Sequence, residues 1–234
     1  MAELLYEGKA KQVYKTEKED EYLIHYKDDA TAGNGVKHDK FEGKGVLNNT
    51  ISCIIFDMLE EAGIKTHMIK KLNERDILVK KVDIFPWEVI IRNITTGSFC
   101  RRLGAPEGIV LDEPIFEMSY KNDEYGDPLI NDDHAVALKL ATREELAYIK
   151  ETTLKINELL KEFFLSMNLK LVDFKIEFGK TADGTILLAD EISPDSCRLW
   201  DVDTNQKYDK DVFRQDIGDL IETYKAVLAR MQNK

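Results

Sequence analysis

The chain has 234 residues, of which 43% are hydrophobic, and a formal net charge of −11 at pH 7. This length can bury the core of one domain or of two small lobes. The excess of acidic residues argues against a nucleic-acid or anionic-membrane surface, because both partners require a basic face. The three cysteines lack metal-type spacing, and no apolar run has signal-peptide or membrane-spanning length. We therefore expect a cytoplasmic protein that binds neither nucleic acid nor membrane.

The first third of the chain reads as antiparallel strands around one helix. The expected elements, in chain order, are a hairpin, a loop, a helix and two short strands: residues 4–16 with 21–27, 28–35, 47–62, 67–72 and 77–82. Gly63 follows the helical run as a C-terminal glycine would. Pro86 then marks the expected junction between an N-terminal lobe, residues 1–83, and a C-terminal lobe, residues 84–234.

Within the first hairpin, the segment YEGKAKQVY is a candidate phosphate site. Gly8 lacks a Cβ atom and would let the backbone approach a ligand, while Lys9 and Lys11 supply positive charge to phosphate. A bulge flanked by two solvated lysines is the alternative, because the chain has neither a Walker sequence nor a Rossmann fingerprint.

The segment EVIIRNITTGSF, residues 88–99, is a second candidate anion site. Arg92 ends an apolar strand, and Gly97 with Ser98 can begin a helix whose free N–H groups suit phosphate. Ser98 could equally serve only as the helix N-cap.

The second half is expected to contain one exposed loop and two long helices. Residues 107–133 are acidic and contain proline and glycine, which is typical of a loop that could act as a lid. Thr142 with Glu145 predicts a capping box for a helix that continues to Met167. The last helix is expected over residues 211–231, with these residues on its buried face: Phe213, Ile217, Leu220, Tyr224, Val227 and Leu228.

Residues 172–190 read as a hairpin with an unusual pair of acids. Alternation places Val172 and Phe174 on one face and Glu177 on the other. If Asp183 and Gly184 form a two-residue turn, Glu177 lies directly opposite Asp190, with the Cβ atoms about 4.5–5.5 Å apart. Like charges at that distance require a raised pKa or a bound divalent cation, and oxygen ligands favour Mg²⁺, Mn²⁺ or Ca²⁺. Solvated edge acids, neutralised by Lys175, are the alternative.

The segment that follows, residues 193–201, combines turn formers, acids and Arg198. A polar loop that carries an arginine beside two acids indicates a phosphate and metal site.

Together the segments YEGKAKQVY, PWEVIIRNITTGS, VDFKIEFG and DEISPDSCRLWD resemble the phosphoribosylaminoimidazole-succinocarboxamide synthase (SAICAR synthetase) family of purine biosynthesis, in family order. The resemblance implies an α+β, two-lobed fold: a smaller, antiparallel β-rich N-terminal lobe, a larger α+β lobe, and an ATP cleft between them, as in kinases or ATP-grasp enzymes. It also implies a homodimer. The implied enzyme is an ATP-dependent ligase that joins L-aspartate to 5-amino-1-(5-phosphoribosyl)imidazole-4-carboxylate (CAIR), through an acyl phosphate in our hypothesis.

The resemblance also implies roles for individual residues. Glu177 and Asp190 resemble the magnesium ligands. The positions that resemble the ATP-binding residues are Gly8, Lys9, Ala10, Lys11, Val79, Lys80, Lys81, Val82, Ile84 and Lys121. Arg92, Ser98 and Arg198 match positions that hold the ribose phosphate. Asp173, Lys175 and Asp195 are expected to complete the catalytic cleft. A phosphotransferase or a nucleotide-binding pseudoenzyme would use similar residues, but a pseudoenzyme should lack one of the two metal acids.

Overall fold

The structure is a computed structural model that describes residues 3–32 and 37–233. Its first sheet is antiparallel, with strand order β1-β2-β3-β7-β6. The bounds are β1 Leu4–Glu7, β2 Lys11–Lys15, β3 Glu21–Tyr26, β6 Met68–Lys71 and β7 Asp76–Lys80. Helix α1, Lys44–Glu61, packs on β3 and β6. It ends near Gly63, whose φ of +85° is the left-handed conformation predicted for a C-terminal glycine.

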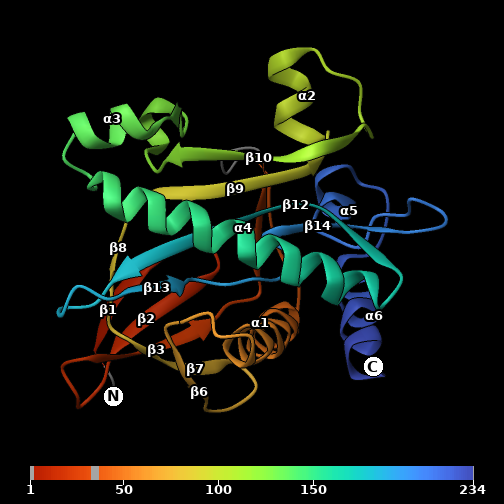
Figure 1. Cartoon of the computed structure of the whole chain (residues 1–234). Helices are drawn as coiled ribbons and strands as arrows, with labels where there is room; N and C mark the ends of the chain where they lie inside the picture. Colours follow the sequence, from red (N-terminus) through yellow and green to blue (C-terminus); the bar gives the residue numbers. More distant parts are fainter. Residues whose placement is uncertain (1–2, 33–36, 234) are drawn as a thin grey trace.

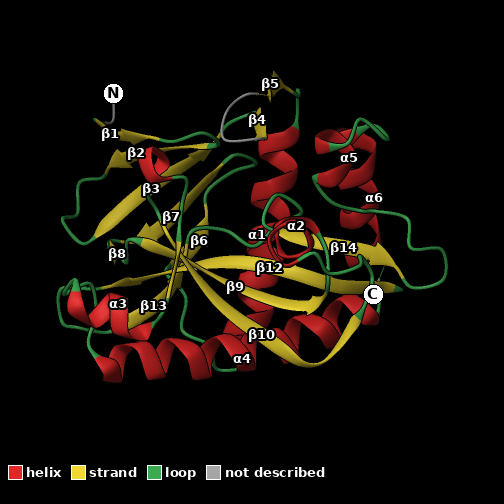
Figure 2. Ribbon diagram, turned by 90° about the horizontal axis from the view of Figure 1, so that it is seen from above, coloured by secondary structure: helices red, strands yellow, loops and turns green. Residues whose placement is uncertain are grey.

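The second sheet has strand order β11-β10-β9-β12-β13, and β8 and β14 also pair with β12. The bounds are β8 Asp83–Ile84, β9 Trp87–Ile94, β10 Val110–Tyr120, β11 Leu129–Ile130, β12 Leu169–Lys180, β13 Ile186–Ala189 and β14 Cys197–Asp201. Helix α4, Arg143–Leu165, covers one face of this sheet, while the first sheet lies towards the other side (Figures 1 and 2). The capping box of α4 is present, with Thr142 and Glu145 bonded reciprocally as predicted.

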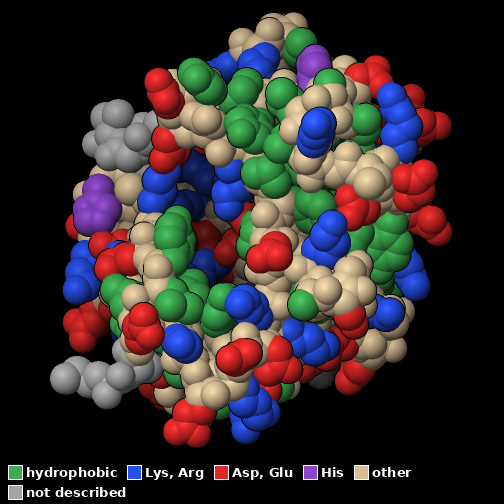
Figure 3. Space-filling view, turned by 90° about the vertical axis from the view of Figure 1, so that its left-hand side faces the viewer, with side chains coloured by type: hydrophobic (Ala, Val, Ile, Leu, Met, Phe, Trp, Pro, Cys, Tyr) green, Lys and Arg blue, Asp and Glu red, His purple; other side chains and the backbone are tan. Residues whose placement is uncertain are grey.

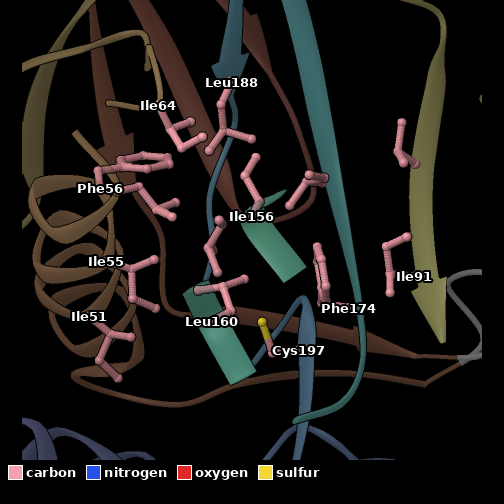
Figure 4. Packing of buried hydrophobic residues seen from close by; sticks show 14 of the residues in the cluster. Ile51, Ile55, Phe56, Ile64, Ile91, Ile156, Leu160, Phe174, Leu188 and Cys197 are labelled. Carbon is pink, nitrogen blue, oxygen red and sulfur yellow. The ribbon is translucent and has the colours of Figure 1, made fainter. Parts of the chain in front are cut away.

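A single buried cluster joins the two sheets. Ile55 and Phe56 of α1 face Leu188 of β13, and Ile156 of α4 and Phe174 of β12 continue the same cluster (Figure 4). Both sheets therefore pack against a common apolar core. The polar face of β12, which carries Lys175 and Glu177, faces the cleft between the two sheets. Within the described residues, no helix is long and apolar enough to cross a membrane.

Three expected elements differ from the structure in the first half of the chain. Residues 4–16 are not one strand, because Gly8 N donates to Lys11 O and turns β1 into β2. The loop expected over residues 28–35 contains β4, Asp29–Ala32, which pairs with β5, Lys37–Lys40, while residues 33–35 lie outside the described part. The lid expected over residues 107–133 contains β10, Val110–Tyr120, which pairs with β9 along most of its length, and the short strand β11.

The prediction of a single C-terminal helix over residues 211–231 is also wrong. It consists of α5, Asp211–Arg214, and α6, Leu220–Gln232, and the intervening residue Asp216 has a φ of +54°. Ile217 falls in this break and is 57% exposed, whereas Tyr224 is fully buried as predicted. The other two helices are α2, Gly97–Leu103, and α3, Asp132–Ala137, and a short 3₁₀ turn spans Asp123–Tyr125.

Candidate active site

A polar cleft runs between the β1–β2 turn of the first sheet and the polar face of the second sheet. Its three adjoining cavities share lining residues, among them Glu88 and Asp127. On this side of the molecule, basic and acidic side chains gather in one hollow (Figure 3). The cleft is therefore charged but locally compensated, which suits a ligand that carries both phosphate and a metal ion.

The acids Glu177 and Asp190 reach this cleft through a register that differs from the predicted one. The hairpin turn is a three-residue loop in which Gly184, at φ +88°, donates its N–H to Thr181 O. Glu177 consequently pairs with Ala189, and Asp190 lies one residue beyond the ladder. Asp190 has a φ of +64°, a conformation that is uncommon outside glycine and that turns the chain out of the strand.

Glu177 and Asp190 interact nonetheless, and both line the same two cavities. Burial and the neighbouring Asp190 carboxylate raise the pKa of Glu177 to about 7. Burial alone would also raise the pKa of Asp190, but the Lys11 ammonium outweighs it and holds that pKa below its usual value. Lys11 is in ion-pair contact with Asp190, and Lys121 Nζ lies 2.6 Å from Glu177 Oε1.

The two acids fit a magnesium ion that also contacts a nucleotide. Magnesium is commonly held by one or two protein carboxylates, with substrate phosphates and water completing its shell. Within the described ranges, no group of three or more His, Cys, Asp or Glu side chains is arranged to hold a metal without other ligands. A cation here would compete with Lys11 and Lys121 for the carboxylates, and it would relieve the repulsion between them.

The predicted lysine loop closes one end of the cleft. Gly8, Lys9, Ala10 and Lys11 line the same cavity as Lys121 and Glu177. The Lys11 side chain is only 13% exposed and also contacts Glu191 at 3.2 Å. Lys9 is more open, with its Nζ 3.3 Å from Asp123. This end therefore presents several ammonium groups around a small apolar patch formed by Val13 and Ile24.

The other end of the cleft is organised by Asp173. Asp173 lies on β12 directly between its cross-strand partners Arg92 on β9 and Arg198 on β14. Its Oδ2 accepts hydrogen bonds from Arg92 Nη1 at 3.0 Å and from Arg198 Nη1 at 2.8 Å. Arg92 Nη2 also donates to Ser98 Oγ at 3.0 Å. The structure thus brings Asp173 and Arg198 to the segment that holds Arg92 and Ser98, and it orients both guanidinium groups.

Gly97 makes room for this arrangement. Its φ is +56°, and a Cβ atom at this position would lie 2.7 Å from Arg198 Nη2. A larger residue would therefore displace the guanidinium as well as strain the backbone. Ser98 is the second residue of α2, whose N-cap is Thr96, so its hydroxyl is not the N-cap.

Asp195 is buried at the centre of a separate charged cluster. Its Oδ2 lies 2.5 Å from Lys44 Nζ, and its Oδ1 accepts a hydrogen bond from the Tyr224 hydroxyl. Burial would raise the pKa of Asp195, but Lys44 and Lys210 hold it well below the usual range. Lys175, the remaining predicted catalytic residue, lies nearby in the cleft and pairs with Glu88 at 2.8 Å.

The predicted adenine-side residues are not among those that line the cleft cavities. Val79 and Lys80 lie on β7, and Lys81 and Val82 link it to β8, which contains Ile84. Val82 and Ile84 pack over Gly179, where a Cβ atom would lie 2.5 Å from Val82. These positions are close to the hairpin that carries Glu177 but separate from the lysine loop.

Comparison with known proteins decides the family. The sequence model described as SAICAR synthetase matches residues 4–231. Phosphoribosylaminoimidazole-succinocarboxamide synthase of Finegoldia magna is 66% identical over 230 residues, which cover 98% of this chain and 99% of that protein. The protein of the same name from Caldanaerobacter subterraneus is 60% identical, with coverages of 98% and 97%. The chain belongs to the SAICAR synthetase family.

Solved structures of the SAICAR synthetase family have the same fold. A type-2 SAICAR synthetase in complex with ADP superposes with a TM-score of 0.95 at 49% identity, covering 98% of this chain and 97% of that one. The synthase from Ehrlichia chaffeensis gives a TM-score of 0.96 at 45% identity, covering 98% of each chain. The predicted α+β fold is therefore confirmed. Family membership also makes the chain an ATP-dependent ligase of CAIR and L-aspartate in purine biosynthesis.

Several residues of the cleft and of the buried Asp195 cluster were missed by reasoning from the sequence. Glu191, which is 6% exposed, accepts a hydrogen bond from Ser193 Oγ at 3.0 Å and contacts Lys11. Because Glu191 directly follows Asp190 in the sequence, it could have been predicted as a further acid of the site. Lys44 gave no signal, because its partner lies 151 positions away. Arg214 was hidden by the prediction of one continuous C-terminal helix, and Lys210 lies just before the predicted start of that helix.

Proposed function

We propose that the charged cleft is where ATP phosphorylates the CAIR carboxylate and where L-aspartate then captures the activated carbonyl group. The observation that carries the proposal is the division of one cleft into two ends. Lysines and paired acids gather at one end, and two arginines held by Asp173 form the other. Phosphoryl transfer depends mainly on positioning and charge neutralisation, and both ends supply these.

ATP is assigned to the end that carries the lysine loop. Gly8, Lys9, Ala10 and Lys11 would cover the phosphates, and Lys121 would add a further positive charge. The apolar side chains of Val13 and Ile24 offer a surface for an aromatic base. The more distant segment Val79, Lys80, Lys81, Val82 and Ile84 remains our candidate for the adenine-side wall and the link between the proposed lobes, residues 1–83 and 84–234.

Magnesium is assigned to Glu177 and Asp190. When bound there with nucleotide phosphates, it would supply charge stabilisation to the transferred phosphoryl group. The position of the two acids supports the assignment, because both line the same two cavities, and burial followed by the neighbouring Asp190 carboxylate raises the pKa of Glu177 to about 7.

CAIR is assigned to the arginine end. Arg92, Ser98 and Arg198 would hold its ribose phosphate, since guanidinium groups match phosphate oxygens in two-pronged contacts. Asp173 would act through the two arginines by fixing their orientation. This placement directs the imidazole carboxylate towards the middle of the cleft, where Lys175, Glu177 and Asp195 line one cavity.

The reaction then needs two displacements. A carboxylate oxygen of CAIR attacks the γ-phosphorus of ATP, the bond to ADP breaks, and an acyl phosphate forms. The aspartate amine attacks the carbonyl carbon, inorganic phosphate leaves, and the nitrogen loses a proton as the amide forms. Lys175 would stabilise negative charge on the carbonyl oxygen, while Asp195 shapes the wall beside it. We further propose a cytoplasmic homodimer.

A reaction with and without aspartate tests this function. The purified chain is mixed with ATP, magnesium and CAIR, and ADP and amide product are measured together. We expect ADP and amide to form in equal amounts, both dependent on aspartate. ADP release unaffected by aspartate, without amide, would instead identify a phosphotransferase, and nucleotide binding without turnover would identify a pseudoenzyme.

A further inference from the structure

Glu117 is a largely buried acid that has no role in the assignments above. It lies on β10, in the acidic segment expected to form a lid, and its side chain is only 12% exposed. In the ladder between β9 and β10, Ile115 is the cross-strand partner of Arg92. Glu117 lies two residues further along the same face of β10, so it is the diagonal neighbour of Arg92. A long side chain at a diagonal position can reach its neighbour across the two strands.

The Glu117 carboxylate binds two arginines through separate oxygens. Oε2 accepts a hydrogen bond from Arg92 Nε at 2.8 Å, and Oε1 accepts one from Arg102 Nη2 at 2.7 Å. Arg102 belongs to α2, and its Nε also donates to the backbone oxygen of Ser98 at 3.2 Å. Glu117 therefore joins strand β9, which carries Arg92, to helix α2, which carries Ser98. Both of these residues are assigned to the ribose phosphate of CAIR.

The bonds of Arg92 leave a defined part of its guanidinium for a ligand. Nε donates to Glu117, Nη1 to Asp173 at 3.0 Å and Nη2 to Ser98 at 3.0 Å. A guanidinium has five N–H groups, so two of them, one on Nη1 and one on Nη2, have no acceptor within the described ranges. Arg92 lines the cavity at the arginine end, where these two N–H groups can donate to phosphate oxygens.

Asp173 alone does not fix Arg92 in this orientation. Asp173 Oδ2 accepts from both Arg92 and Arg198, so one carboxylate is shared by two guanidinium groups. Glu117 supplies Arg92 with a second carboxylate through a different nitrogen, and rotation of the guanidinium would break one of the two bonds. Among the described residues that line the cavity at the arginine end, Glu117 is not present, so it would act through Arg92 rather than touch the ligand.

We propose that Glu117 is a positioning residue for the nucleotide substrate, an inference that rests on the proposed assignment of CAIR to the arginine end. It holds Arg92 in the one orientation that leaves two N–H groups for the phosphate. Orientation and charge have opposite consequences here. A carboxylate that only contributed negative charge would repel the phosphate, so its neutralisation would strengthen binding. Neutralisation of a carboxylate that orients Arg92 would weaken binding.

Kinetics of Glu117→Gln test the proposal. Glutamine keeps the size of the side chain but has one oxygen acceptor, so it cannot accept from Arg92 and Arg102 through separate oxygens. We expect the KM for CAIR to rise about tenfold, since a charge-assisted hydrogen bond is lost, whereas kcat and the KM values for ATP and aspartate change less than about twofold. Glu117→Asp keeps the charge and both oxygens and should raise the CAIR KM less. Glu113→Gln, at an exposed position of the same strand, is the matched control.

Two further measurements follow the effect to Arg92. Ribose 5-phosphate should inhibit the wild type competitively against CAIR, and its Ki should rise in Glu117→Gln in parallel with the KM for CAIR. In an Arg92→Met background, Glu117→Gln should change the KM for CAIR less than about twofold further, because the two residues act as one unit. Arg102→Met leaves the bond between Glu117 and Arg92 in place and should raise that KM less than Glu117→Gln does.

The outcomes distinguish this proposal from the function on which it rests. An unchanged or lower CAIR KM in Glu117→Gln would overturn the proposal, as would equal rises in all three KM values or an undiminished effect in the Arg92→Met background. Thermal unfolding should show that Glu117→Gln remains folded; if it does not, a CAIR KM in Glu117→Asp equal to the wild-type value would overturn the proposal. If ribose 5-phosphate does not compete with CAIR in a wild type that forms amide, the assignment of CAIR to the arginine end fails instead.

Discussion

Burial and the neighbouring Asp190 carboxylate raise the pKa of Glu177 to about 7. The two acids interact even though Asp190 lies one residue beyond the last cross-strand pair of the hairpin, Glu177 with Ala189. The left-handed φ of Asp190 brings its carboxylate back towards Glu177. The two acids are therefore brought together by a backbone turn rather than by strand pairing. The strained conformation is retained at the point where the cleft needs a second carboxylate.

Replacing Glu177 should separate activity from folding. Glu177→Gln removes a proposed metal ligand, so we expect turnover to fall by roughly a hundredfold or more. The melting temperature should change little, because this side chain lies on the polar face of β12 and contributes little to the core. Steady-state turnover and thermal unfolding check both parts, with Glu222→Gln on the exposed surface as control. Near-normal turnover would refute the metal role.

Arg198→Lys should weaken binding of CAIR rather than of ATP. Arg198 contacts both Asp173 and Asp211 through separate nitrogens, and lysine cannot reproduce that two-sided arrangement. We expect the KM for CAIR to rise about tenfold, with the KM for ATP within about twofold of the wild type. If both constants rise equally, Arg198 does not belong to the CAIR end alone.

Lys44→Met should destabilise the fold strongly. Lys44 is fully buried and pairs with Asp195 at 2.5 Å, and removal of one partner from such a pair typically costs about 3–5 kcal/mol. Lys210 remains 3.6 Å from Asp195, which favours the lower end of this range. Urea unfolding of Lys44→Met is compared with that of Lys225→Met, whose exposed pair should contribute less than about 1 kcal/mol. Equal midpoints for the two variants would contradict the buried pair.

Asp209 should make stability depend on pH. It is fully buried, and burial, followed by the nearby Asp211, raises its pKa to about 7 from the ordinary value of 3.8. A raised pKa favours the protonated form of Asp209 in the folded state. The contribution of Asp209 to the free energy of unfolding is therefore complete below about pH 4 and is lost as the pH rises through about 7. Urea unfolding at pH 5 and pH 8 measures this loss.

Asp209→Asn provides the comparison. Asp209 accepts hydrogen bonds from Leu199 N at 2.9 Å and Asp211 N at 2.7 Å through different oxygens, and asparagine can keep only one oxygen acceptor. The variant should lose roughly 1 kcal/mol at pH 5. The wild-type advantage should shrink at pH 8, where the Asp209 carboxylate is ionised. An advantage that stays constant with pH would exclude Asp209 as the titrating group.

Local patterns in the sequence predicted the elements whose signals are short-range. The capping box of Thr142 and Glu145 and the helix before Gly63 depend on neighbouring residues, and both are confirmed. The C-terminal helix failed because periodicity alone does not reveal the break at Asp216, whose left-handed backbone interrupts the helix. The lid failed because β10 depends on pairing with β9, which no local pattern reports.

The site was predictable only where its residues fall in recognisable segments. Arg92, Asp173 and Arg198 each lie in such a segment, but their contact depends on the register of three strands. Lys44 and Asp195 meet across 151 positions, and Lys210 lies just before the helix expected over residues 211–231. The parts of the site that could not be predicted from the sequence therefore depend mostly on long-range strand pairing and on buried ion pairs.

Oxygen-isotope transfer tests the central claim most directly. CAIR labelled with oxygen-18 in its carboxylate is converted with ATP and aspartate, and the released phosphate is analysed by mass spectrometry. If the carboxylate attacks the γ-phosphorus, one labelled oxygen per turnover appears in inorganic phosphate and one remains in the amide. Release of unlabelled phosphate alongside amide product would contradict the acyl phosphate and the account of the cleft that depends on it.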